Sequence, residues 1–220
     1  MVRRSQRMLG TMVAALMFLV MGALPAKAVT TAGLWHMDES SGQAIDSSGM
    51  GNNGTLENVT RVTPGFDGTG GAYNFNGTSS RVVIPNSSSL NPGALDVTMT
   101  AHVKFSVIPP LSVGDYDLIR KGTGIYKMEI RNTGQAYCRF KGSTSGLSVK
   151  KGPNLADGQW HTIACRKTSS GVTLTVDGTS FTKSGSVGSI SSSSPLYFGA
   201  KPNGGDRYNG ILDEVTIAFG

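Results

Sequence analysis

The stretch from residue 97 to residue 107 alternates strictly between apolar and polar side chains. A period of two residues puts every apolar side chain on one face of an extended strand, so this stretch predicts a long β-strand with one buried face. The same alternation runs through residues 172–176, and the Asp177-Gly178 pair that follows predicts a hairpin into residues 179–181. The apolar positions of the long strand are Val97, Met99, Ala101, Val103, Phe105 and Val107.

Short apolar segments separated by glycine- and serine-rich turns continue through the rest of the chain. No segment after residue 28 keeps a 3.6-residue apolar period over three turns, which argues against long helices. The pattern therefore predicts an all-β fold, an antiparallel two-sheet jelly-roll sandwich of about a dozen strands. The other predicted strands are residues 34–37, 73–75, 81–84, 118–121, 126–131, 135–141, 161–168, 196–198 and 211–219.

Residues 1–28 have the composition of an export signal. Three arginines precede an uncharged apolar run over residues 8–24, and Ala26-Lys27-Ala28 supplies the small residues that a signal peptidase accepts. We expect cleavage after Ala28 and a secreted product, and a permanent membrane anchor is the alternative. Residues 29–220 are sufficient for a single domain with its own core.

Most of the net charge of +6 belongs to this predicted signal. The signal carries four basic residues and no acidic one, so 16 basic and 14 acidic residues remain in 29–220. Nucleic-acid binding through phosphates needs Lys and Arg clustered on one face, which this balance disfavours. After cleavage we expect neither a nucleic-acid partner nor a membrane span.

Two cysteines, Cys138 and Cys165, fall inside predicted strands. In an exported chain we expect one disulfide between them, with two buried free thiols as the alternative. The chain-entropy model gives such a crosslink a stabilisation of about 3.5 kcal/mol. A zinc pair would need CxxC or HxxxH partners that the sequence lacks.

Several separated motifs occur in one order along the chain. Residues 33–42 lead into the Asp- and Gly-rich stretch 46–55, and Tyr73-Asn74-Phe75-Asn76-Gly77 follows. Asp157-Gly158-Gln159-Trp160-His161-Thr162 comes later, with 176–178 after it and Tyr208-Asn209-Gly210-Ile211-Leu212-Asp213-Glu214-Val215 at the end. Together they resemble the laminin-G-like domains of bacterial secreted proteins, which belong to the concanavalin A-like lectin and glucanase superfamily. The resemblance covers about residues 31–220 and implies the jelly-roll fold, which hosts lectins, adhesion modules and glycosidases alike.

The resemblance also implies a structural calcium ion. Calcium takes six to eight oxygen ligands, several of which can be backbone carbonyls. The expected ligands are Asp213 in the last strand, Asp38 at the end of the first strand, and the loop at Gly77. The alternative is that Asp213 caps a loop or pairs with Arg207.

For two residues of the 157–162 motif we expect structural rather than ligand-binding roles. Trp160 follows the Asp157-Gly158 turn and begins a predicted strand, so we expect its indole to anchor the core or a sheet edge rather than to stack on a sugar. His161 has no second histidine or carboxylate pair nearby in sequence. We expect a hydrogen-bonded structural histidine.

The sequence lacks the groups that a jelly-roll glycosidase requires. Such enzymes flank the scissile bond with two carboxylates, commonly on one strand as Glu-x-Asp-x-x-Glu, and no such motif occurs. Acidic residues two apart occur once, at Asp115 and Asp117, where the adjacent Gly114 predicts a turn. A glycosidase is therefore the least favoured function, and we expect no enzyme activity.

Binding is the favoured function, because a secreted sandwich without catalytic groups offers sheet faces and loops for recognition. The expected ligand is a carbohydrate, such as a glycan or a cell-wall polysaccharide, and the candidate stacking residues are Tyr116, Tyr126 and Tyr137. Ordinary sheet packing is the alternative for each ring. A rival function is an adhesion or scaffold module that binds extracellular or cell-surface proteins. A basic face compatible with acidic glycans is predicted from Arg120, Lys121, Lys127, Arg131, Arg139 and Lys141.

Overall fold

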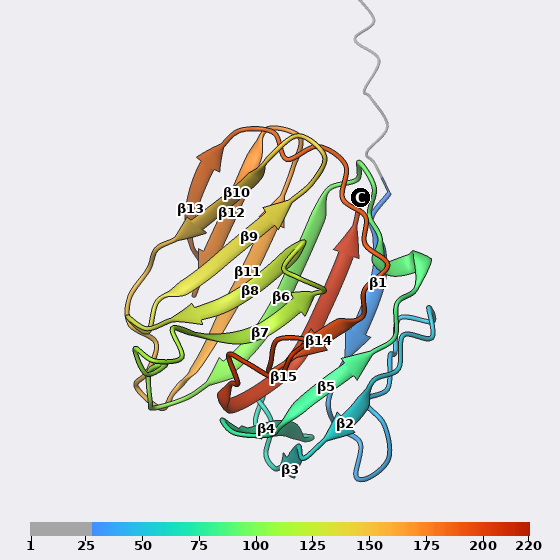
Figure 1. Ribbon diagram of the computed structural model, residues 1–220. Coiled ribbons are helices and arrows are strands. Elements are labelled where there is room, and N and C mark those ends of the chain that lie inside the picture. The colour runs from blue at the N-terminus through green and yellow to red at the C-terminus, as the bar shows by residue number, and fades with distance from the viewer. Residues whose placement is uncertain (1–27) are drawn as a thin grey trace, which may run out of the picture.

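The fold is a sandwich of two antiparallel sheets (Figure 1). It is seen in a computed structural model that describes residues 28–220, so residues 1–27 of the predicted export signal lie outside the described residues. In the first sheet the strand order is β13-β12-β11-β6-β15-β4-β3, and β1 pairs with β15 alongside β4. In the second sheet the order is β10-β9-β8-β7-β14-β5-β2. The predicted all-β, two-sheet architecture is confirmed.

The strand bounds are as follows. The first sheet contains β1 (Thr30–Trp35), β3 (Thr60–Val62), β4 (Ala72–Asn76), β6 (Val97–Lys104), β11 (Trp160–Lys167), β12 (Gly171–Val176), β13 (Thr179–Ser184) and β15 (Asn209–Phe219). The second sheet contains β2 (Thr55–Glu57), β5 (Arg81–Ile84), β7 (Asp115–Lys121), β8 (Tyr126–Arg131), β9 (Ala136–Lys141), β10 (Gly146–Lys150) and β14 (Leu196–Phe198). A single 3-10 turn, η1, spans Ser88–Leu90.

The core lies between the two sheets, where the inward face of each strand meets its counterpart. Strand β6 alternates buried and half-buried residues along its whole length, as its sequence predicts. Trp35 of the first sheet is completely buried and meets Phe198 of the second sheet edge to face, with ring centroids 5.0 Å apart. Large apolar side chains on both inward faces supply the hydrophobic stabilisation of the sandwich.

A disulfide joins the two sheets. It links Cys138 of β9 to Cys165 of β11, and both residues are fully buried. The two Cα atoms are 5.7 Å apart, within the usual range for such a bond. This confirms the predicted pairing.

The hairpin and the structural histidine are also as predicted. Asp177 and Gly178 both have positive φ, 47° and 82°, which is the conformation of a two-residue turn between β12 and β13. His161 bonds through its two ring nitrogens to Asp177 and Asp157, at 2.8 and 3.0 Å. Trp160 begins β11, is half-buried and packs edge to face on Phe66, with centroids 5.8 Å apart.

Several elements differ from the sequence prediction. Strand β6 ends at Lys104, and Val107 is exposed. Residues 115–117 were expected in a turn but form the first part of β7, because Gly114 supplies the turn and both acids find ion-pair partners. Asp115 pairs with Arg131 of β8, and Asp117 pairs with Arg120 of β7 itself. Strands β2, β3 and β10 were not predicted, since each is short and lies at or near a sheet edge. Over the described residues, no helix is long and apolar enough to cross a membrane.

Candidate ligand-binding pocket at the loop rim

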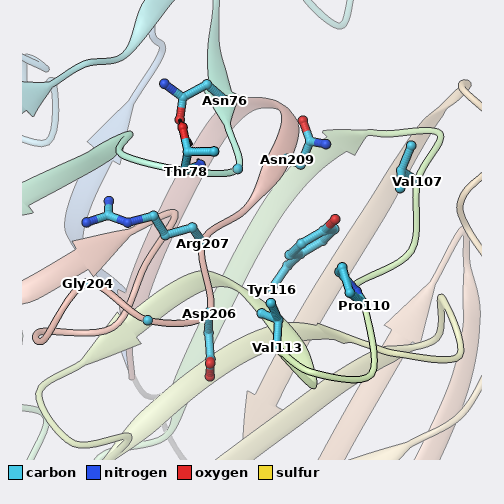
Figure 2. Close-up of a pocket in the computed structure, with 12 residues that line it drawn as sticks. Asn76, Thr78, Val107, Pro110, Val113, Tyr116, Gly204, Asp206, Arg207 and Asn209 are labelled. Carbon is cyan, nitrogen blue, oxygen red and sulfur yellow. Dashed lines mark hydrogen bonds between the residues drawn. The ribbon is translucent and has the colours of Figure 1, made fainter.

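Three loops meet at one end of the sandwich. The start of β1 and the end of β15 lie at the other end. The three loops are the β4–β5 turn, the loop from β6 to β7 and the loop from β14 to β15. Strand β15 starts at this rim with Asn209 and runs to Phe219, which pairs with Thr30 at the other end. Between the loops lies an open pocket of about 430 Å³ (Figure 2). We call it the rim pocket; its lining residues are Asn76, Gly77, Thr78, Val107, Pro110, Val113, Tyr116, Gly204, Gly205, Asp206, Arg207 and Asn209.

The β4–β5 turn forms a rigid wall of the rim pocket. The side-chain oxygen of Asn76 accepts hydrogen bonds from the backbone N–H groups of Thr78, Ser79 and Ser80, at 2.9, 2.9 and 3.1 Å. Such Asx-type bonding fixes a turn without help from the core. Gly77 has a φ of 72°, and an added Cβ would lie 2.9 Å from the Cβ of Asn209. The turn therefore needs glycine in order to sit directly against Asn209.

The β14–β15 loop is held on both sides of the pocket. Arg207 donates to the backbone oxygen of Ser80 at 3.2 Å, and the backbone oxygen of Asp206 accepts from the N–H of Asp117 at 2.9 Å. The carboxylate of Asp206 pairs with Lys201. In Figure 2 this carboxylate points away from Asn76, Thr78 and the other labelled side chains. Arg207 thus lines the pocket while its guanidinium is held by Ser80, and the acid of Asp206 points elsewhere.

An aromatic cluster supports the pocket from below. Tyr208 is fully buried, and its ring meets those of Phe75, Phe105 and Tyr116 with centroids 5.8, 6.1 and 5.8 Å apart. Tyr116 lines the pocket, and its hydroxyl donates to the backbone oxygen of Ile108 at 3.4 Å. A phenol is neutral near pH 7 even when exposed, and burial raises the pKa of Tyr116 further. A neutral hydroxyl beside apolar walls suits a polar, uncharged ligand.

The groups that line the rim pocket are mostly uncharged. The amide of Asn209, the hydroxyl of Thr78 and the guanidinium of Arg207 can bond to sugar hydroxyls, while the apolar contacts come from Val107, Val113 and Pro110. The amide of Asn76 is already engaged within its own turn. Asp206 is the one carboxylate among the lining residues, and it is already paired. A glycoside hydrolase needs two carboxylates across the scissile bond. The lining of this pocket does not contain that pair.

Tyr116, Tyr126 and Tyr137, the predicted stacking residues, occupy three different environments. Tyr116 borders the rim pocket, but only 3% of it is exposed, so it leaves little ring surface for a sugar to stack on. Tyr126 is fully buried in the core and donates to the backbone oxygen of Leu90 at 3.1 Å, so its ring does not face solvent. The ring of Tyr137 already contacts Lys127 and Arg131, whose charged groups lie 5.3 and 5.1 Å from its centroid. The structure therefore brings one of the three rings to a pocket.

The acids of β7 belong to a buried ion-pair network. Arg120 donates to both oxygens of Asp117, at 3.0 and 2.9 Å, and to Glu129 at 3.2 Å. Lys127 pairs with Glu129, and Arg131 with Asp115 at 2.6 Å. Asp117 and Glu129 are both completely buried. Burial and the nearby Glu129 raise the pKa of Asp117 well above its ordinary value.

Four of the six residues of the predicted basic face are therefore not free to bind an anion. Arg120, Lys127 and Arg131 neutralise the carboxylates of this network. Lys121 is fully buried and donates to the side-chain oxygen of Asn86 at 2.6 Å. Burial lowers the pKa of Lys121 to about 8. Arg139 and Lys141 remain on the surface.

Within residues 28–220, a single group of three or more acidic, histidine or cysteine side chains is close enough to share a metal ion. It consists of Asp115, Glu129 and Asp206, whose ligand atoms lie within 4.8 Å of one another. Basic side chains already contact each of these carboxylates. The group therefore has the contacts of an ion-pair network.

The three expected calcium ligands do not form one set. Asp38 and Asp213 lie near each other, where they hold the loop between β3 and β4: Asp38 accepts from the N–H of Gly71 at 2.6 Å, and Asp213 accepts from that of Phe66 at 2.7 Å. Gly77 follows the opposite end of β4, about 16 Å away along an extended strand. Asp213 thus caps a loop, and Arg207 contacts Ser80 instead.

The sequence prediction missed most of the polar residues that line the rim pocket. Thr78, Arg207 and the side chain of Asn209 were not singled out as candidates, although the Tyr208-Asn209-Gly210 and Asn76-Gly77 motifs were noted. Those glycine-containing turns were the available signal, because they mark loops where the backbone approaches another segment closely.

Comparison with protein families matches residues 76–218 to the concanavalin A-like lectin/glucanases superfamily, in its laminin-G group. A search of the curated proteins finds no significant match. Among solved structures, the binding domain of Paraclostridial Mosquitocidal Protein 1 is similar, with a TM-score of 0.67 and 19% identity over 86% of this chain and 48% of that one. A structure of botulinum neurotoxin type C, whose cell entry depends on two ganglioside molecules, gives a TM-score of 0.62 and 13% identity over 86% and 47%. Domains LG4-5 of the mouse laminin alpha1 chain give 0.54 and 18% over 66% and 40%. The chain spans about half the length of the two toxin structures.

Proposed function

Because the chain belongs to the concanavalin A-like lectin/glucanases superfamily, we propose that it is a non-catalytic binding module that takes a carbohydrate in the rim pocket. The observation that carries this proposal is the lining of the pocket. Amide and hydroxyl groups and Arg207 line the pocket together with apolar side chains and Tyr116, while the one carboxylate is turned away and paired. The similar mosquitocidal toxin structure is a binding domain, and cell entry of botulinum neurotoxin type C depends on gangliosides, which supports a sugar ligand here.

The proposal is tested by titrating residues 29–220 with a panel of neutral oligosaccharides and comparing two amide variants. Asn209→Ala removes an amide from the pocket, so the affinity of a bound sugar should fall about tenfold. Gln159→Ala removes an exposed amide that does not line the pocket and should leave the affinity unchanged. Equal affinity of Asn209→Ala and the unaltered chain would exclude the rim pocket as the sugar site.

One observation favours a protein partner at the same rim as a second candidate function. The loop between β6 and β7 exposes four large apolar side chains, and Leu111 is 86% exposed; the others are Val107, Ile108 and Val113. Exposed apolar clusters mark interaction surfaces. In this case, binding to cells would survive periodate oxidation of their glycans and would be lost in Leu111→Ser. If periodate oxidation abolishes cell binding and Leu111→Ser does not, a protein partner at this rim is excluded.

We also propose that the module works outside the cytoplasm. The disulfide between the sheets supports this, because such bonds persist in oxidising compartments. Mass spectrometry of the product from the culture medium should find an N-terminus at Val29. An N-terminus at Met1 in that product would contradict cleavage after Ala28.

A structural calcium ion is a separate proposal, limited to Asp38 and Asp213. The two carboxylates are close enough that Asp38 and Glu214 help to raise the pKa of Asp213, behind the larger effect of burial, and a cation would relieve this repulsion. Bound calcium would fasten the loop between β3 and β4 to the first and last strands. The melting temperature should then rise when calcium replaces EGTA, and Asp213→Asn should abolish that rise. An equal melting temperature in both buffers would exclude the ion.

A further inference from the structure

Positive charge is concentrated along one side of the sandwich. Residues 136–201 contain eight Lys and Arg residues but only two acids, Asp157 and Asp177. Both acids bond to His161, so they are already engaged. Five of the eight basic residues belong to the edge formed by β9, β10 and β13: Arg139, Lys141, Lys150, Lys151 and Lys183.

These five side chains have no counter-charge. No hydrogen bond or ion pair of the side chain is found for any of them within residues 28–220, whereas Arg120, Lys127 and Arg131 all bind carboxylates. The four lysines are exposed, and Arg139 is half-buried. Like charges held together on a folded surface without acids create a positive potential that attracts anions.

The edge also has the shape of a binding groove. Strands β10 and β13 are the terminal strands of the two sheets and run side by side at one side of the sandwich (Figure 1). Between them lies a groove of about 350 Å³. We call it the edge groove; it is lined by Ser148, Val149, Lys150, Lys151, Phe181, Thr182 and Lys183. None of these residues lines the rim pocket.

The strand register extends the positive charge from the edge groove onto the outer face of β9. Lys150 pairs with Tyr137, and Ser148 pairs with Arg139. Residues two apart on a strand share a face, so Tyr137, Arg139 and Lys141 lie on the same face as Lys150. A chain leaving the groove across β10 would meet Arg139 and Lys141 next.

We propose that the edge groove binds an anionic polysaccharide, separately from the rim pocket. Its acid groups contact Lys150, Lys151 and Lys183, and the ring of Phe181 gives the apolar face of a sugar residue a surface to pack on. Arg139 and Lys141 bind the next acid groups of the same chain. A long polymer fits this arrangement because the basic side chains continue from the groove onto the neighbouring strand β9.

The groove favours a polysaccharide over the other common polyanions. A membrane surface requires its basic side chains on one outward face. Arg139, Lys141 and Lys150 share such a face, but Lys183 lies across the groove on β13, so the charges do not form a single outward face. Single-stranded nucleic acid is bound by several aromatic rings that stack on successive bases, and Phe181 is the single ring among the lining residues.

The test compares two triple variants that each remove three positive charges. The groove variant removes the positive charges of the edge groove by Lys150→Gln, Lys151→Gln and Lys183→Gln. The control variant removes three positive charges outside the groove by Arg61→Gln, Lys104→Gln and Arg166→Gln. The probes are heparin as a sulfated chain, polygalacturonate as a carboxylated chain and dextran as a neutral one, titrated between 50 and 300 mM NaCl. Melting temperatures confirm that all proteins are folded.

We expect binding of heparin or polygalacturonate, no binding of dextran, and affinity that falls as salt rises. Each exposed charge contact changes an affinity by about two- to fivefold, so the groove variant should bind about tenfold or more weakly. The other triple variant should stay within about threefold of the unaltered chain, and Asn209→Ala should match it. The Asn209→Ala result tests the edge groove separately from the rim pocket, because binding at one site can be absent while binding at the other is present.

Three results would overturn the proposal. The first is failure to bind either anionic polysaccharide at 50 mM NaCl. The second is an equal loss of affinity in both triple variants, which would show a response to net charge alone. The third is tighter binding to phosphatidylglycerol vesicles or to single-stranded DNA than to both polysaccharides, which would assign the groove to a different polyanion.

Discussion

Replacing Arg120 by methionine should destabilise the protein strongly, because this guanidinium neutralises two buried acids. It makes three charged hydrogen bonds, two to Asp117 and one to Glu129, and neither acid has any exposed surface. Removing one partner of a buried ion pair leaves an uncompensated charge, which costs about 3–5 kcal/mol. We expect Arg120→Met to lower the free energy of unfolding by about 4 kcal/mol at pH 8.

The loss should shrink at lower pH. The pKa of Asp117 is already raised by burial and by Glu129, and removing Arg120 takes away a nearby positive charge that lowers it. An acid whose pKa is higher in the folded state binds more protons when folded, so stability rises as the pH falls toward that pKa. The difference between Arg120→Met and the unaltered chain should therefore be smaller at pH 5 than at pH 8.

Urea unfolding followed by tryptophan fluorescence measures this effect, because Trp35 is completely buried in the folded state. Asp117→Asn combined with Arg120→Met should lose less than Arg120→Met alone, since a neutral amide replaces the stranded charge. Arg166→Met is the control: its side chain is 59% exposed, with one ion pair at 3.4 Å, and should cost less than about 1 kcal/mol. A loss below about 1 kcal/mol for Arg120→Met, or an equal loss in the double variant, would refute the structural role of these acids.

Three further perturbations test other parts of the structure. Cys138→Ala with Cys165→Ala opens a crosslink between residues 27 apart and should cost about 3.5 kcal/mol in urea unfolding; a cost under about 1 kcal/mol would contradict it. Gly77→Ala forces a side chain onto a residue with a φ of 72° beside Asn209, so the melting temperature and sugar affinity should both fall, whereas unchanged values would show that the turn tolerates a Cβ. Burial raises the pKa of Asp213 to about 6, so in EGTA the stability should rise by up to about 3 kcal/mol from pH 7 to pH 4, and Asp213→Asn should flatten this rise. An identical pH dependence in Asp213→Asn would assign the rise to other groups.

The sequence predicted the strands whose side chains alternate between core and solvent. The bounds 81–84, 126–131 and 196–198 agree with β5, β8 and β14, and the cysteine pairing is confirmed. Asp115 and Asp117 were placed in a turn because acids beside Gly114 usually mark one, whereas basic partners, Arg131 on β8 and Arg120 on β7, allow them to sit in a strand. Sequence order does not show which charges face each other across strands.

The rim pocket could be predicted only in part, because it forms where three loops far apart in sequence converge. Tyr116 and Gly77 were singled out separately, for different roles, and the structure places both in the lining. Tyr126 looked equivalent to Tyr116 in the sequence but faces the core. The basic face also lies elsewhere than predicted. Arg120 and Lys127 form ion pairs with buried acids, and the basic side chains without such partners lie along β9, β10 and β13. Burial and pairing, which decide these outcomes, are properties of the folded chain.

The central claim, that the rim pocket binds carbohydrate, is tested most directly by following backbone amide signals in nuclear magnetic resonance spectra during titration with a sugar from the oligosaccharide panel. Binding at the rim should shift the amides of Thr78 in the β4–β5 turn, Arg207 in the β14–β15 loop and Asn209 at the start of β15. Signals of the buried strand β6 should stay in place. Saturable binding that leaves these three amides unchanged would contradict the assignment of the pocket.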